Sequence, residues 1–172
     1  MTDTFLYFAY GSNMFTRRLT ASDRASSAVA EGTGFVAGRR LTFDKPSRDG
    51  SGKCDIEVAN PTDRVYGVLF RIAATEEVAL DRAEGVGRGY RRESLEVITA
   101  HGPVSAIAYV ATAREPGRRP YEWYKAYVVE GAIEHGLPRA YVEWVLTFPA
   151  RPDPDAERRS ENEALLFGGA SP

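Results

Sequence analysis

The sequence has few of the residues that perform covalent or metal-based catalysis. Its 172 residues include one cysteine, Cys54, and two histidines, His101 and His135. One cysteine cannot form an intramolecular disulfide, and isolated histidines do not supply the clustered ligands of a zinc site. Neither histidine has a neighbouring serine or cysteine that would indicate a nucleophile with its base. We therefore expect no disulfide framework, no bound metal, no cofactor and no enzyme nucleophile.

Long apolar runs and a strong excess of one charge are also absent. No segment approaches the roughly 18 consecutive apolar residues of a membrane helix, and the chain begins without the positive region and apolar stretch of a signal peptide. The formal net charge of −2 differs from the basic balance of most nucleic-acid-binding domains. Paired arginines such as Arg17-Arg18 and Arg39-Arg40 are scattered, which indicates solvated surface charge. We expect a cytoplasmic protein that binds neither membranes nor nucleic acid.

The chain nevertheless has enough apolar material for one ordinary core. Apolar residues make up 43% of it, and aromatic residues include nine Tyr, eight Phe and two Trp, which argues against wholesale disorder. We expect one domain over residues 1–148. Residues 149–172 are rich in charge and proline, and they predict a flexible C-terminal tail.

Strand-like patterns come first along the chain, and most of the helical patterns come last. The predicted strands cover residues 5–10, 34–43, 54–59, 64–72, 90–99 and 104–112, and the predicted helices cover residues 75–84, 121–134 and 139–148. Thr75 is the expected N-cap of the first helix and Gly85 its stop. Residues 45–53 and 114–120 predict loops. Because strands and helices do not alternate regularly, the order predicts an α+β fold rather than a doubly wound parallel sheet.

Glu84 is the carboxylate with the most unusual predicted position. It lies in the last turn of the 75–84 helix, directly before Gly85. The unpaired carbonyl groups of a helix C-terminus repel negative charge, which disfavours the charged form of a glutamate there. A carboxylate perturbed in this way suits general acid–base catalysis. On the residues alone, an exposed glutamate that pairs with Arg82, Arg88 or Arg91 remains the more common arrangement.

The segment Tyr10-Gly11-Ser12-Asn13 follows a short aromatic strand and predicts a tight loop. Its backbone N–H groups could bind a carboxylate or polarise a carbonyl oxygen, with Gly11 allowing close approach. Most strand-to-turn junctions have only a structural role, so this tetrapeptide alone leaves both interpretations open.

Three groups of residues, taken in order, resemble the gamma-glutamylcyclotransferase family, within the superfamily that includes the AIG2-like proteins. They are the segments 5–14 (FLYFAYGSNM), 80–86 (LDRAEGV) and 124–138, which carries Tyr124-Lys125, Gly131-Ala132 and the Gly-Leu-Pro stop at 136–138. The resemblance covers nearly all of the chain to residue 148. It implies a small, mixed, β-barrel-like α+β sheet with one inserted helix and C-terminal helices.

The resemblance also implies a reaction and a site. A small gamma-glutamyl compound would be cyclised to 5-oxoproline by attack of its own α-amino group on its γ-carbonyl, with release of an amine or amino acid. Glu84 would be the catalytic residue. The substrate-binding residues would be Phe8, Ala9, Tyr10, Gly11, Ser12, Asn13, Tyr90, Tyr109 and Tyr124.

Several alternatives stay open at this point. Tyr109 lies in the middle of a predicted strand, where an ordinary core tyrosine is about equally common. A non-catalytic AIG2-like module that binds a small acidic metabolite would share the same loop and pocket. A protein adaptor would use the apolar residues 165–167 of the tail. The sequence specifies neither the leaving group nor whether the protein is a monomer or a homodimer.

Overall fold

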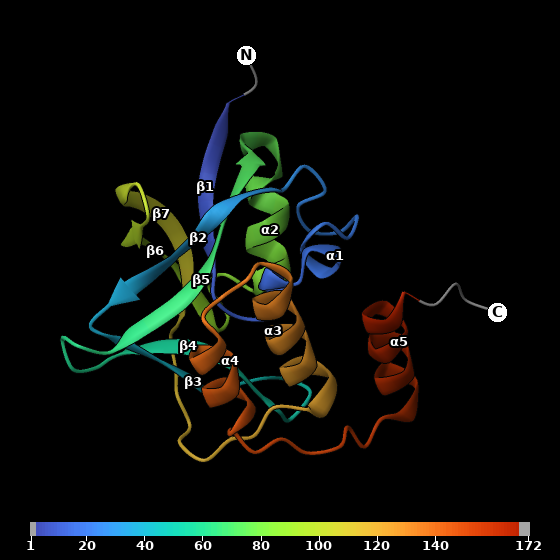
Figure 1. The fold of residues 1–172 in the computed structure, drawn as a ribbon. Helices are drawn as coiled ribbons and strands as arrows, with labels where there is room; N and C mark the ends of the chain where they lie inside the picture. The colour runs from blue at the N-terminus through green and yellow to red at the C-terminus, as the bar shows by residue number, and fades with distance from the viewer. Residues whose placement is uncertain (1–2, 169–172) are drawn as a thin grey trace.

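Five strands close into a barrel that forms the centre of the molecule (Figure 1). The structure is a computed structural model that describes residues 3–168, so residues 1–2 of the predicted domain and residues 169–172 of the predicted tail lie outside the described residues. The barrel strands are, in their order around it, β1 (Thr4–Ala9), β5 (Arg64–Ala73), β2 (Val29–Ala37), β6 (Tyr90–Thr99) and β7 (Gly102–Ala111). Neighbours are antiparallel except β1 and β7, whose parallel pairing closes the barrel. The expected α+β fold with a barrel-like sheet is confirmed.

Strand β5 holds the end of β1 in place. Its apolar side chains Val65, Val68 and Phe70 are fully buried, as expected of β-branched and aromatic residues on a core-facing sheet. At Gly67 the neighbouring strand comes unusually close, because an added Cβ atom would lie 2.4 Å from the carbonyl oxygen of Ala9. This close approach fixes the point at which β1 ends and the following loop begins.

A two-stranded hairpin, β3 (Arg39–Pro46) and β4 (Gly52–Val58), projects from the barrel. The prediction of one bent strand over residues 34–43 is wrong, because Gly38 separates β2 from β3 with a φ of 71°. Backbone in this left-handed region favours glycine, and it reverses the chain here. The predicted loop at 45–53 is shorter than expected, since its two ends belong to β3 and β4.

Helical segments lie beside the barrel, and the last of them along the chain is the one furthest from it (Figure 1). They are η1 (Ser12–Met14), α1 (Thr16–Leu19), η2 (Ala74–Glu76), α2 (Glu77–Glu84), α3 (Glu122–Glu134), α4 (Arg139–Leu146) and α5 (Ala156–Phe167). Helix α2 ends at Gly85 in the left-handed conformation, as predicted. The predicted N-cap Thr75 is wrong, because it lies inside a 3-10 turn that precedes the helix. None of the helices within residues 3–168 is both long and apolar enough to cross a membrane.

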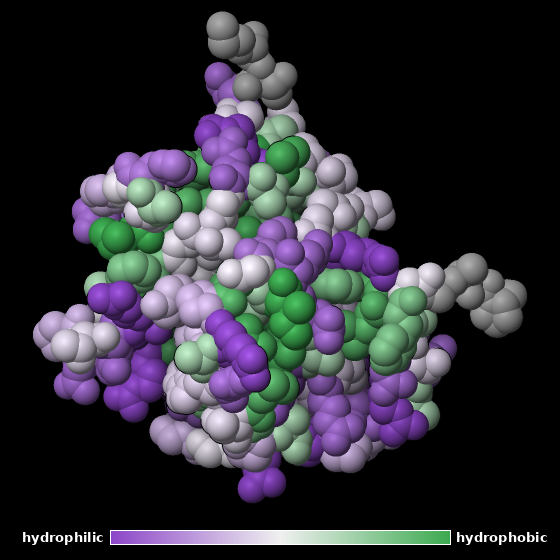
Figure 2. Space-filling model, viewed as in Figure 1, coloured by the Kyte–Doolittle hydropathy of each residue, from purple (hydrophilic) through white to green (hydrophobic). Residues whose placement is uncertain are grey.

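The predicted flexible tail differs from the structure, which places an ordered segment and the helix α5 beyond residue 148 (Figure 1). Leu165 and Leu166 are partly buried and contact the core. The hydroxyl of Tyr127 on α3 donates a hydrogen bond to the carbonyl oxygen of Asn162 at 2.9 Å. Figure 2 shows apolar residues on this face over α3 and α5. Although the composition of this segment is charged, its few apolar side chains pack against the core and hold the helix there.

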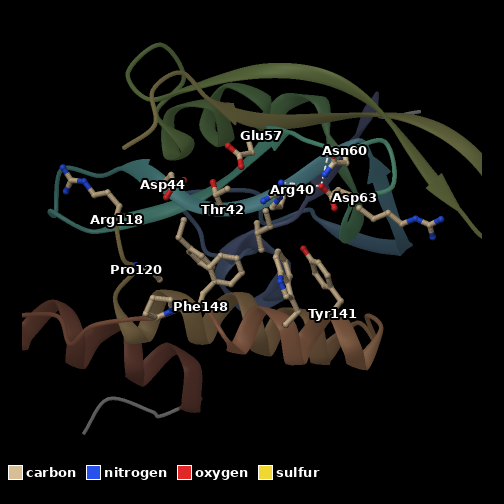
Figure 3. Close-up of a pocket in the computed structure, with 15 residues that line it drawn as sticks. Arg40, Thr42, Asp44, Glu57, Asn60, Asp63, Arg118, Pro120, Tyr141 and Phe148 are labelled. Carbon is tan, nitrogen blue, oxygen red and sulfur yellow. Dashed lines mark hydrogen bonds and ion pairs between the residues drawn. The ribbon is translucent and has the colours of Figure 1, made fainter. Parts of the chain in front are cut away.

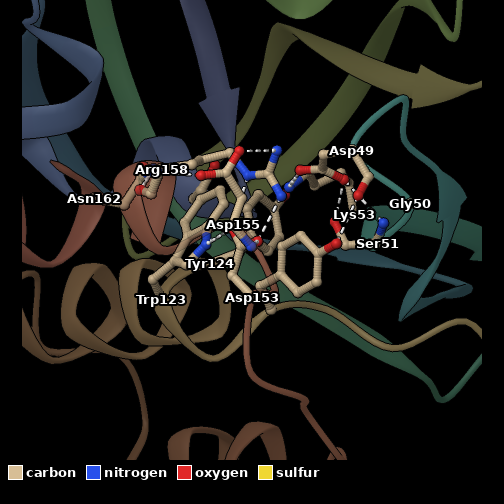
Figure 4. A network of polar contacts seen from close by, with 12 residues as sticks. Asp49, Gly50, Ser51, Lys53, Trp123, Tyr124, Asp153, Asp155, Arg158 and Asn162 are labelled. Atoms are coloured by element: carbon tan, nitrogen blue, oxygen red, sulfur yellow. Dashed lines mark hydrogen bonds and ion pairs between the residues drawn. The ribbon is translucent and has the colours of Figure 1, made fainter. Parts of the chain in front are cut away.

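Asp153 anchors the start of this segment (Figure 4). Its fully buried carboxylate accepts hydrogen bonds from the indole nitrogen of Trp123 at 2.8 Å and from the guanidinium of Arg158 at 2.7 Å and 2.5 Å. On the other side of the same network, Asp49 pairs with Lys53 at 2.9 Å, and the backbone oxygen of Asp49 accepts a bond from Tyr121. The network joins the hairpin, α3 and α5.

We expect Asp153→Ala to lower the free energy of unfolding by about 3 kcal/mol, because it leaves a buried indole N–H and a guanidinium without their partner. The hydrogen bonds from Arg158 hold the pKa of Asp153 at about 2, below the roughly 3.9 of an unfolded aspartate. The ionised Asp153 therefore contributes fully to the free energy of unfolding above pH 4, and this contribution is lost as the pH falls toward 2. Urea unfolding at pH 7 and pH 3 measures both effects. Glu163→Ala, an exposed change on α5, should have almost no effect.

Candidate active site

The end of helix α2 brings Glu84 against the loop that follows β1. The Glu84 side chain is 16% exposed, and its Oε1 atom lies 2.8 Å from the side-chain nitrogen of Asn13. The same oxygen accepts a bond from the guanidinium of Arg24 at 2.9 Å. The structure thus joins the two predicted parts of the site, which are 71 residues apart in the sequence.

The carboxylate of Glu84 is oriented by these two donors. Both bind Oε1, while Oε2 has no hydrogen-bond partner among residues 3–168. The alternative of an exposed glutamate paired with Arg82, Arg88 or Arg91 is wrong, because Glu84 is largely buried and its partner is Arg24, in the segment that precedes β2. The result is a carboxylate with one oxygen held by two donors and one oxygen that is free among the described residues.

The loop Tyr10–Asn13 lines the cavity, and its Gly11 lies against Cys54. Gly11 has a φ of −115°, so it needs no left-handed conformation. Its lack of a side chain gives space to the neighbouring strand, because an added Cβ atom would lie only 3.0 Å from the Cβ atom of Cys54. The backbone N–H groups of Gly11, Ser12 and Asn13 have no acceptor in the part of the chain that the structure describes. Free amides at a cavity wall are suited to bind an anionic or carbonyl oxygen.

Four predicted tyrosines, Tyr10, Tyr90, Tyr109 and Tyr124, line the same cavity. Tyr90 donates to the carbonyl oxygen of Cys54 at 2.6 Å, and the Cys54 amide donates to the hydroxyl of Tyr124 at 3.1 Å. Tyr10 donates to the backbone oxygen of Tyr109. These bonds tie the tyrosines to one another and to β4.

The tyrosines cannot act as bases near neutral pH. Burial raises the pKa of Tyr10, Tyr90 and Tyr124 well above the usual value. Burial also raises the pKa of the Cys54 thiol to about 12. Glu84 is the one carboxylate among the residues lining this cavity.

The structure gathers most, but not all, of the predicted site residues. Glu84, the four tyrosines, Gly11, Ser12 and Asn13 line the cavity. Phe8 and Ala9 do not reach it: both are fully buried in the core, where they support the strand that carries the loop. Residues that the sequence analysis did not single out for the site are Tyr7 and Cys54, which also line the cavity, and Arg24. Tyr7 could be suspected from the aromatic run, whereas nothing in the sequence pointed to Arg24.

A wider groove opens on the other side of Glu84, with a volume of ≈ 670 Å³. It lies between the start of the β3–β4 hairpin turn and the loop after α2. Its lining includes Glu84 and Asp81 and four cationic residues, Lys45, Arg48, Arg82 and Arg88. Glu84 thus stands at the junction of a narrow inner cavity and a wide, cationic outer groove.

Comparisons with known proteins identify a similar family model, similar sequences and similar solved structures. The sequence model of the AIG2-like family matches residues 64–145. The chain is 35% identical over 147 residues to the gamma-glutamylcyclotransferase of Mus musculus, covering 82% of this chain and 77% of that protein. It is 32% identical over 145 residues to the protein of the same name from Homo sapiens, with the same coverage of 82% and 77%.

A solved structure of a gamma-glutamyl cyclotransferase superposes with a TM-score of 0.86 at 29% identity. The superposition covers 97% of this chain and 100% of that one, so the likeness extends through most of the C-terminal segment. Together with the identities above, this leads to one conclusion: the chain belongs to the gamma-glutamylcyclotransferase family of enzymes.

Proposed function

We propose that this enzyme cyclises a small gamma-glutamyl substrate to 5-oxoproline and releases the attached amine or amino acid, with Glu84 as the catalytic residue. The observation that carries the proposal is the pairing of a single ionisable carboxylate with unbonded loop amides in one cavity. A cavity without a thiolate, a histidine or a second carboxylate suits a reaction whose nucleophile belongs to the substrate.

The free Oε2 atom of Glu84 would take a proton from the substrate's α-ammonium group. The resulting amine attacks the γ-carbonyl carbon, so one C–N bond forms in the ring and the C–N bond to the leaving nitrogen breaks. The α-nitrogen gives up two protons and the leaving nitrogen gains two. Glu84 carries a proton across from one nitrogen to the other and returns to its starting form.

The amides of Gly11, Ser12 and Asn13 would stabilise the negative charge that develops on the γ-carbonyl oxygen. The buried tyrosines would hold the glutamyl chain bent, because ring closure requires the amine and the carbonyl carbon to approach within about 3–3.5 Å. If the cavity holds the substrate in this bent conformation when it binds, the substrate loses less conformational entropy in the ring-closing step itself.

The cationic outer groove favours a leaving group that carries a carboxylate. Lys45, Arg48, Arg82 and Arg88 form no ion pair with a described residue, so a carboxylate there would meet unpaired positive charge. We therefore place the glutamyl part of the substrate at Glu84, where the inner cavity of ≈ 30 Å³ meets the groove, and a carboxylate-bearing amino acid in the groove.

A matched pair of substrates tests this placement. Gamma-glutamylalanine and gamma-glutamylethylamine differ only in the carboxylate of the leaving group. We expect kcat/KM to be at least about tenfold higher for the dipeptide, which corresponds to one exposed or half-buried charge contact. Changing both Lys45 and Arg48 to glutamine should reduce this ratio, whereas Arg139→Gln, at an exposed site on α4 away from the groove, should leave it unchanged. Equal rates for the two substrates would contradict the placement.

The function itself is tested by incubating the purified protein with a panel of gamma-glutamyl amino acids, amines and peptides and assaying 5-oxoproline. Release of 5-oxoproline from any of them supports the proposal. Binding of these compounds in a calorimeter without turnover of any of them would favour a non-catalytic module instead. A cytoplasmic location is part of the proposal, since the chain carries one free cysteine and it is buried.

A further inference from the structure

A second groove lies on the far side of the β3–β4 hairpin from the active site. It has a volume of ≈ 700 Å³ and runs between the hairpin and helix α4 (Figure 3). Volumes of about 300–1,000 Å³ are typical of sites for small molecules. Its lining residues do not include any that line the cavity around Glu84.

One wall of this groove is aromatic. Tyr141 and Trp144 on α4 and Phe148 just beyond it form a continuous row, with ring centroids 5.6 Å apart for the first pair and 4.9 Å apart for the second. Figure 3 shows Tyr141 and Phe148 pointing from the helix toward the hairpin. Trp144 and Phe148 are only partly buried, so part of this surface is available to a ligand.

The opposite wall carries carboxylates that lack a cation. Asp44 on β3 and Glu57 on β4 form no ion pair with a residue in the described range 3–168. Burial, and then the charge of Glu57, raise the pKa of Asp44. Two of the three arginines of the groove are already paired, since Arg40 pairs with Asp63 at 3.6 Å and Arg118 pairs with Glu115 at 2.5 Å. The third, Arg64, lies over the ring of Phe35 at 4.4 Å, so one unpaired guanidinium stands against two carboxylates without a partner in residues 3–168. The charge left unbalanced in the groove is therefore negative.

Two hydroxyl groups in the lining have no hydrogen-bond partner among residues 3–168. They belong to Thr42 on β3 and Tyr141 on α4, and each of these residues is only 8% exposed. Figure 3 shows both side chains directed into the space between hairpin and helix. An unpaired buried hydroxyl costs about 1–3 kcal/mol, so two of them facing one groove call for an explanation such as a bound polar group.

We propose that this groove is a binding site for a small organic cation, an ammonium or guanidinium group carried on a flat apolar body. The apolar body lies against the row of Tyr141, Trp144 and Phe148, and the cation is held between these ring faces and the carboxylates of Asp44 and Glu57. The oxygens of Thr42 and Tyr141 accept the remaining N–H bonds. The site stands independently of the function proposed for Glu84.

The groove is in contact with the active site through one side chain. The ring of Phe43 lies 5.1 Å from that of Phe148 in the groove and 6.4 Å from that of Tyr124 in the catalytic cavity.

The test uses 2-phenylethylamine as the probe, with 2-phenylethanol and 3-phenylpropanoate as neutral and anionic controls of similar shape. Titrations of the full chain are followed by NMR through the indole N–H signals of its two tryptophans. We expect the amine to bind at least tenfold more tightly than either control and to shift the signal of Trp144 but not that of Trp123, which is bonded to Asp153.

Variants decide the location of the binding. Asp44→Asn combined with Glu57→Gln should reduce the affinity for the amine to that for the alcohol, while Glu143→Gln, an exposed change on α4 outside the groove, should leave it unchanged. Glu84→Gln should also leave it unchanged, which separates this site from the catalytic cavity. The proposal is overturned if the amine does not bind, if the alcohol binds equally well, if the carboxylate variants have no effect, or if Glu84→Gln abolishes binding.

Discussion

Glu84→Gln is expected to lower kcat by about 10³-fold or more while the protein stays folded. Proton transfer by a positioned side chain contributes about 10²–10⁴-fold to catalysis, and Glu84 is the residue of its cavity that can supply it. Glutamine has the same shape, and its side-chain oxygen can still accept the bonds from Asn13 and Arg24. The variant therefore removes the proton acceptor and keeps its surroundings. The measurement is the rate of 5-oxoproline release at saturating substrate, with the thermal midpoint as the check on folding.

The pH dependence adds a second readout for the same variant. If Glu84 must be ionised to accept the proton, the wild-type enzyme loses activity on the acidic side, and the residual activity of Glu84→Gln does not. Glu77→Gln is a matched control, because this glutamate lies at the other end of α2, where it pairs with Arg92. Full activity in Glu84→Gln would remove Glu84 from the mechanism.

Asn13→Asp is expected to lower kcat/KM about 10²-fold at neutral pH. The side-chain nitrogen of Asn13 lies 2.8 Å from Oε1 of Glu84 and 3.0 Å from the hydroxyl of Tyr7. Replacing this donor by a carboxylate puts two negative groups at contact distance, and such a pair shares one proton. The catalytic carboxylate would then be protonated when it should accept a proton, although the side chain has almost the same shape.

The expected signature of Asn13→Asp is a displacement of the acidic limb of the kcat/KM profile to higher pH, with partial recovery of activity in alkaline buffer. A merely structural role for Asn13 would lower activity equally at all pH values. Asn60→Asp makes the same chemical change in an exposed turn and should leave the profile unchanged. An unaltered profile in Asn13→Asp would show that this contact does not control Glu84.

Local patterns in the sequence predicted the parts of the site that lie within single elements. The aromatic run before Gly11 predicted a strand and its loop, and Gly85 predicted the end of α2. Because glycine and turn residues act on their own neighbourhood, they locate Glu84 and the loop without knowledge of the fold. The family resemblance then linked these parts, which no local rule could do.

Long-range contacts account for what the sequence analysis missed. Arg24 looks like any surface arginine until the chain before β2 is folded against the end of α2. Helix α5 is rich in charge, and its position depends on Trp123 and Tyr127 of the distant helix α3, which bond Asp153 just before α5 and Asn162 within it. The pairing of β3 with β4 was not predicted, because the strand patterns at 34–43 and 54–59 do not show that the segment between them is a hairpin turn. Each of these features depends on partners from elsewhere in the chain, and a single sequence does not specify such partners.

The origin of the nucleophile is the central claim, and isotopic labelling tests it most directly. A gamma-glutamyl dipeptide labelled with ¹⁵N at the α-nitrogen of its glutamyl residue is incubated with the enzyme in ¹⁸O-water, and the products are examined by mass spectrometry. If the substrate's own amine attacks the γ-carbonyl, the product is 5-oxoproline that carries the ¹⁵N in its ring and no ¹⁸O. Formation of glutamate that contains ¹⁸O would show attack by water instead and would contradict the account.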